Sequence, residues 1–200
     1  MPGAVILAER RDRKVTELHE WSGYTIIVLV LTRIAWGFVG SRHACFADFL
    51  VGPRRVMAYV QGAAASSAGH NPLGGWSVVA LLALLLLQGI SGLFNSDDVL
   101  FSGPLYYAAS TGFRDAMGEV HEWAFNALLA LVSLHILAVL YHQFKLHEKL
   151  VQAMLRGSAA GREGRAAPVP WWRAAVILVL LALAFWWGLE QAPQPQPLDW

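Results

Sequence analysis

Four long apolar stretches constrain this chain most, because each is long enough to cross a lipid bilayer as a helix. A helical span needs about 20 mostly apolar residues, and the stretches cover residues 21–39, 72–94, 123–144 and 171–189. Charged residues make up only 14% of the chain, against roughly 25% in soluble proteins. The last stretch carries a pair of tryptophans near each end, which is typical of membrane interfaces. The sequence therefore predicts an all-α, polytopic transmembrane helical bundle with four spans.

Lysine and arginine are divided unequally between the two sides of this bundle. Loops 40–71 and 145–170, together with Arg173, hold nine of these residues, and the opposite side holds five. Because positively charged loops tend to stay in the cytoplasm, we expect both loops to be cytoplasmic and the N-terminal segment to lie outside. The net charge of only +1 gives no basic field of the kind that nucleic-acid binding requires. Lipid is a predicted partner and nucleic acid is not.

The spans also predict how the chain is organised. We expect five parts, namely an N-terminal segment (1–20), a three-helix core (21–144), a basic cytoplasmic linker (145–170), an additional transmembrane helix (171–189) and a proline-rich tail (190–200).

The histidines are the best candidates for chemistry in this chain. A single cysteine excludes an intramolecular disulfide, a thiolate zinc site, a four-cysteine iron–sulfur cluster and c-type haem attachment. His121 and His135 are fourteen residues apart in one predicted helix, so they lie about 40° apart around it and about 21 Å apart along it. An ionisable side chain at membrane depth is a functional candidate. The alternative is that each imidazole only hydrogen-bonds to a neighbouring helix.

His19 strengthens the functional interpretation. It stands at the outer end of the first span and shares a predicted depth with His121. Imidazoles from two helices can hold a haem iron between them, and Gly23, one turn after His19, would leave space for a porphyrin face. Close helix packing explains Gly23 equally well. Arg33 is a candidate partner of a haem propionate, although snorkelling to the interface explains it better.

Several strings in the chain resemble the bacterial cytochrome b561 family. They are Leu18–Tyr24, Arg33–His43, Gly69–Gly75, the pair His121 and His135 at their fourteen-residue spacing, and His147–Gly157. The family consists of membrane di-haem b cytochromes, related to the cytochrome b subunit of Ni-Fe hydrogenases. The resemblance implies a multi-pass protein of the bacterial inner membrane that binds haem b and transfers electrons.

The resemblance also implies ligands. His19 and His121 would be the axial pair of the extracytoplasmic haem, and His135 would be one ligand of a cytoplasmic haem. Apart from the resemblance, we expect Arg33 and His70 to contact the cofactor, with a propionate or a quinone head group as the partner of His70. The alternative is that His70, in a loop without demanding geometry, is simply solvated.

A family helix that carries a further ligand is missing from the sequence. Residues 3–8 resemble the last turns of that helix, so we expect the natural chain to begin further upstream and residues 9–17 to form a hairpin between two helices. As it stands, the chain can ligate one haem b with its own residues. For a second haem, His135 would need a substitute ligand such as His142 or a residue of a partner subunit.

Three functions follow as hypotheses. The leading one is a membrane cytochrome that passes electrons between a quinol pool, or another donor, and a redox partner such as a c-type cytochrome. It would be an electron-transfer protein or oxidoreductase subunit rather than a self-contained enzyme. The first alternative is the cytochrome b subunit of a hydrogenase-like or formate dehydrogenase-like complex. An alternative of another class is a transporter or proton-relay bundle that uses its histidines.

Overall fold

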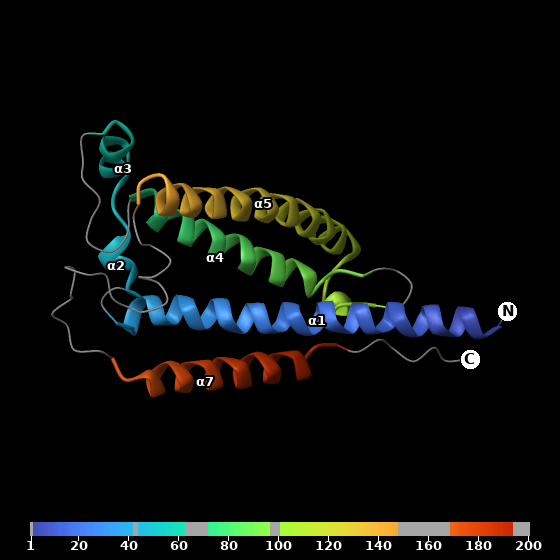
Figure 1. Cartoon of the computed structure of the whole chain (residues 1–200). Coiled ribbons are helices and arrows are strands. Elements are labelled where there is room, and N and C mark those ends of the chain that lie inside the picture. Colours follow the sequence, from blue (N-terminus) through green and yellow to red (C-terminus); the bar gives the residue numbers. More distant parts are fainter. Residues whose placement is uncertain (1, 42–43, 63–71, 97–100, 148–168, 194–200) are drawn as a thin grey trace. The chain divides into compact units, whose positions relative to one another are not determined.

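A computed structural model describes residues 2–41, 44–62, 72–96, 101–147 and 169–193 of the chain (Figure 1). Throughout these ranges the regular structure is helical, apart from one isolated bridge between Ser96 and Ser102. The four long helices are α1 (Pro2–Val39), α4 (Pro72–Gly92), α5 (Thr111–Phe144) and α7 (Trp171–Glu190). All four contain a stretch long and apolar enough to cross a membrane. The prediction of an all-α bundle with four spans is confirmed.

Helix α1 is longer than the sequence analysis predicts. The expected hairpin over residues 9–17 is wrong, because α1 continues without interruption from Pro2 to Val39. Residues 9–17 contain no glycine or proline and consist largely of Glu, Arg and Lys, which are good helix formers. Helix α5 likewise begins at Thr111, a dozen residues before its apolar stretch. In both helices the helical backbone extends beyond the part that hydropathy alone identifies.

Three short elements connect the long helices within the described ranges. Helices α2 (Phe46–Phe49) and α3 (Pro53–Val60) lie between α1 and α4, and a 3-10 turn, η2 (Tyr106–Ala108), lies between α4 and α5. Proline at the first position of α3 suits a helix start, since its missing N–H would have no helical partner there. The tail from residue 194, most of the linker 145–170 and His70 lie outside the described residues.

The chain divides into two compact units, and each is described by itself. The first unit comprises residues 1–32, 85–125 and 178–200. In it, Gly89 of α4 lies directly against Ile27 of α1, which is almost completely buried. Aromatic rings join α1 to α7, since Trp21 stacks on Trp186 with ring centroids 6.0 Å apart. Gly89 thus lets α1 and α4 approach closely. The stacked indole rings pack α7 against α1.

The second unit comprises residues 33–84 and 126–177. Here two phenylalanines of α2 fill the space above glycines of the long helices. The ring of Phe46 contacts Gly37 of α1, and the buried Phe49 lies against Gly75 of α4. A Cβ atom at Gly37 would collide with the Phe46 ring, and one at Gly75 would lie 2.8 Å from the backbone oxygen of Phe49 and 3.1 Å from its ring. The two glycines therefore let α2 pack closely on both helices.

Large apolar side chains are widely exposed along the four spans. Leu137 of α5 is 63% exposed and Trp171 of α7 is 81% exposed. A soluble protein rarely presents so much apolar surface, whereas lipid tails solvate it. The outer surfaces of the spans are therefore suited to a bilayer.

The contact between α1 and α4 leads to a stability prediction. A Cβ atom at Gly89 would lie 2.5 Å from Cγ1 of Ile27, whereas one at Gly188 in α7 would meet nothing within 4 Å. We expect Gly89→Ala to be less stable than Gly188→Ala by about 1–3 kcal/mol, the usual cost of overpacking. Both variants replace a helical glycine by alanine, so the clash with Ile27 is the main difference between them. Thermal unfolding in detergent, followed by circular dichroism, measures it, and equal stabilities would contradict the packing described.

Candidate functional site: two facing imidazoles

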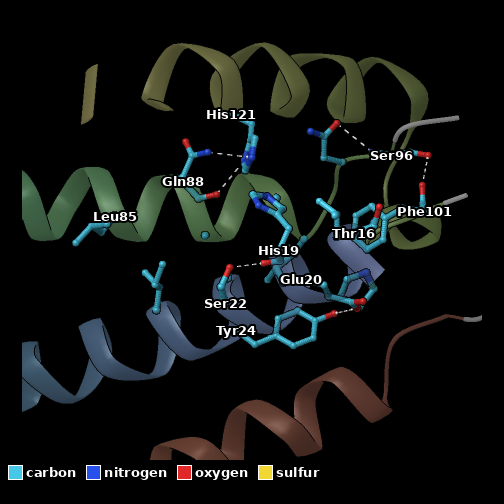
Figure 2. Close-up of a pocket in the computed structure, with 18 residues that line it drawn as sticks. Thr16, His19, Glu20, Ser22, Tyr24, Leu85, Gln88, Ser96, Phe101 and His121 are labelled. Carbon is cyan, nitrogen blue, oxygen red and sulfur yellow. Dashed lines mark hydrogen bonds between the residues drawn. The ribbon is translucent and has the colours of Figure 1, made fainter. Parts of the chain in front are cut away.

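His19 and His121 come together within the first unit. His19 projects from α1 and His121 from α5, with ring centroids 6.1 Å apart and ring planes at 80° (Figure 2). A metal ion bound by one nitrogen of each ring, with bonds of about 2 Å, would hold the ring centres about 6 Å apart. The spacing of the two rings therefore fits axial ligation of one iron from two helices.

Helix α4 fixes the orientation of the His121 ring. Its Nδ1 lies 3.0 Å from the backbone carbonyl oxygen of Gln88 and 3.1 Å from Oγ of Ser91. A carbonyl oxygen only accepts hydrogen bonds, so Nδ1 carries the proton and Nε2 keeps its lone pair. A hydrogen bond of this kind to a backbone carbonyl is what orients metal-binding histidines in proteins and makes them more basic.

The Gln88 side chain occupies the ligating side of the ring. Its Nε2 lies 2.9 Å from Nε2 of His121, so the amide donates to the lone pair that a metal would use. Its Oε1 is buried and has no hydrogen-bond partner among the described residues. A buried polar atom without a partner is costly, so this carboxamide is poorly satisfied where it lies. Metal binding by His121 would require it to rotate away.

A cavity of about 410 Å³ adjoins the two imidazoles (Figure 2). Helices α1 and α4 supply most of its wall, and both histidines line it. Gly23 faces open space, because a Cβ atom there would meet nothing within 4 Å. At Gly92 a Cβ atom would lie only 3.1 Å from Cε1 of His121. Gly92 thus lets the imidazole pack on α4, while Gly23 leaves room for a ligand beside His19.

A carboxylate and a phenol also line the cavity. The Tyr24 hydroxyl donates a hydrogen bond to the carboxylate of Glu20, one turn earlier in α1, and the Tyr24 ring contacts Phe185 of α7. Sequence analysis did not single out Tyr24, Gln88 or Ser91. Gln88 carried a signal, since it is the only side-chain amide in the apolar helix α4.

His135 lies in the second unit and has a different environment. Its Nδ1 is 3.4 Å from Oγ of Ser77 in α4, and among the described residues no second imidazole ring contacts it. His142 follows seven residues later in α5, which is two turns or about 10 Å along the helix. Two rings that leave the same face of one helix at that spacing do not oppose one another across a single iron.

Arg33 also has protein partners in the second unit. Its Nη1 donates a hydrogen bond to the carbonyl oxygen of Ala44 at 3.2 Å, and its guanidinium lies 5.5 Å from the centroid of the Phe46 ring. The charge is thus partly satisfied by the segment that enters α2. His70, the other candidate in this part of the chain, lies outside the described residues.

The fold and the site together define a class of protein: a multi-pass membrane protein with two facing imidazoles inside its helical bundle. The model of one family, described as prokaryotic cytochrome b561, matches residues 3–157. The chain therefore belongs to the prokaryotic cytochrome b561 family, whose members are membrane b-type cytochromes that bind haem b and transfer electrons. His19, His121, His135, Arg33 and His70 lie inside the match, and α7 lies outside it. No curated protein and no solved structure matches the chain.

The hydrogen bonds of His121 predict one tautomer. In protein produced without haem, we expect the proton of a neutral His121 to reside on Nδ1, because the Gln88 carbonyl accepts it. Nitrogen-15 chemical shifts of histidine-labelled protein distinguish the tautomers, and a His121→Gln variant assigns the signal. Gly92→Ala, which crowds the ring, should shift this signal. A proton on Nε2 would contradict the described geometry.

Proposed function

We propose that His19 and His121 are the axial ligands of one haem b, through which the chain passes single electrons. The observation that carries the proposal is the pair of imidazoles on α1 and α5, with a ring spacing of 6.1 Å. The tautomer expected for His121 supports it, since Nε2 keeps the lone pair that an iron would use once the Gln88 amide rotates away. The donor is a quinol pool or another reductant, and the acceptor is a redox protein such as a c-type cytochrome.

The residues around the site supply orientation and electrostatics. When bound, the haem supplies an iron that alternates between its ferrous and ferric forms. The hydrogen bond from His121 Nδ1 to the Gln88 carbonyl keeps the ring in place and increases its electron donation. The Glu20 carboxylate, which lines the same cavity, favours the more positively charged oxidised state. The apolar walls of the cavity lower the local dielectric constant, which strengthens both the hydrogen bond of His121 and the influence of the Glu20 charge.

The proposal assigns one haem to each chain. His135 remains a prediction as ligand of a second haem, and the described residues offer no facing imidazole for it. Arg33 and His70 likewise remain predicted propionate partners. We place the chain in the inner membrane with loops 40–71 and 145–170 in the cytoplasm, so that the His19–His121 site lies toward the outer side. The positive charge of those loops supports this orientation.

Single histidine substitutions test the proposal. A reduced-minus-oxidised spectrum of purified protein should show the α band of a b-type haem, and His19→Ala and His121→Ala should each abolish it, because each removes an axial ligand. His135→Ala is the matched control and should keep the band. Pyridine haemochrome analysis should give about one haem per chain, which is what one facing imidazole pair can hold.

Other outcomes would contradict the proposal in distinct ways. A band that survives His121→Ala would show that the ligands lie elsewhere. Two haems per chain, with half of the signal lost in His135→Ala, would show a second site. Protein that binds no haem even when haem is supplied would favour the proton-relay bundle.

Gly23 offers a test of where the haem lies. We expect Gly23→Leu to weaken haem retention about tenfold or more, because the leucine side chain would enter the space beside His19 that the porphyrin needs. The helical content of the haem-free protein should not change, since this position faces open space. Gly112→Leu is the control, because a Cβ atom there also meets nothing and Gly112 does not line the cavity. Equal haem retention in the two variants would place the haem elsewhere.

A further inference from the structure

Helix α3 is short and strongly amphipathic. At 100° per residue, Val56, Met57 and Val60 fall on one face of the helix, and Arg54 and Arg55 fall on the opposite side. No residue of α3 is buried, and the side chains of Met57 and Val60 are 58% and 61% exposed. The helix therefore presents an apolar face and a basic face without burying either in the protein.

The connections of α3 place it at one membrane surface. The chain enters it from the end of α1 and leaves it toward the start of α4, and both long helices cross the membrane. The chain therefore passes through α3 on the side where α1 ends and α4 begins.

Contacts just before α3 set its depth. The indole nitrogen of Trp76, in the second turn of α4, donates a hydrogen bond to the carbonyl oxygen of Val51 at 3.0 Å. Two residues earlier, Phe49 lies against Gly75. Tryptophan near the end of a span usually marks the headgroup region of a bilayer. The first residue of α3, Pro53, follows within two residues of this hydrogen bond, so the helix begins at the level of the headgroups.

We propose that α3 lies along the membrane surface as an interfacial helix that binds anionic phospholipids. Met57 and Val60 enter the boundary of the acyl chains, and the guanidinium groups of Arg54 and Arg55 pair with lipid phosphates. The lipid surface is the partner that offers both chemistries at this level, since apolar tails lie directly beneath negative charge. A helix this short would bind weakly on its own. Its attachment to spans at both ends keeps it at the surface at high effective concentration.

Site-specific fluorescence in nanodiscs tests the depth of α3. Cys45 is the only cysteine, so a Cys45→Ser background allows a single environment-sensitive probe to be placed by Met57→Cys or, as the control, by Ala58→Cys on the opposite side of the helix. The full chain is reconstituted in bilayers that contain phosphatidylglycerol. We expect nitroxide groups on the lipid acyl chains to quench the probe at position 57 about threefold more than the probe at 58, because only the first faces the tails. A water-soluble quencher should show the opposite order.

The charge dependence is tested in the same system. Replacing phosphatidylglycerol by phosphatidylcholine, or changing both arginines with Arg54→Gln and Arg55→Gln, should move the probe at position 57 toward water. The pair Lys145→Gln and Arg173→Gln removes the same charge from exposed positions and should not move it. Strong quenching by the aqueous reagent in every lipid would overturn the proposal, because it would place this face in water. Protection of the probe from both quenchers would also overturn it, because protein rather than lipid would then cover this face. A probe that is buried equally in both lipids would overturn the role of the anionic headgroups.

Discussion

A polar group inside a lipid bilayer has no water to bind, so it must find its partner within the protein. That constraint organises the site of this cytochrome. His121 satisfies its Nδ1 with a backbone carbonyl of α4 and the hydroxyl of Ser91, and this leaves only one nitrogen for further bonding. The hydrogen bond thus performs two tasks, since it satisfies a half-buried donor and it leaves the lone pair on Nε2. The ring of His19 lies opposite this anchored ring, with the two ring centroids 6.1 Å apart.

Small residues make this arrangement possible on the neighbouring helix. Gly92 admits the ring of His121 against α4, and Gly89, three residues earlier, admits Ile27 of α1. Helix α4 thereby packs closely on α1 and on α5 through glycines in adjacent turns. Helix–helix association in lipid depends on such close packing, because the apolar side chains themselves gain nothing from leaving the tails. The same residues that stabilise the first unit therefore position its imidazoles.

The sequence predicts the spans and the paired imidazoles well, because both depend on properties of residue types and on helical period. Hydropathy marks the four apolar stretches, and the register of His19 and His121 places them at one depth. Hydropathy does not predict that α1 continues through residues 9–17, because these residues are polar. They are nevertheless good helix formers, and the helix includes them. Nor does the sequence reveal the anchor of His121, because every residue has a carbonyl group and only the packing decides which one faces the ring. The partners of Arg33 in the α2 segment depend on a loop path that no periodicity describes.

Helix α7 follows every residue of the imidazole pair and its anchor in the chain. It lies outside the part of the chain that the family shares, yet it stacks Trp186 on Trp21 and Phe185 on Tyr24 in α1. Synthesis proceeds from the N-terminus, so His19, Gln88 and His121 have all been made before α7 exists. The residues that form the imidazole pair and its anchor are therefore all present in the chain before α7 is added. Helix α7 covers one side of α1, which carries His19, but it contributes no residue to the wall of the cavity beside the pair.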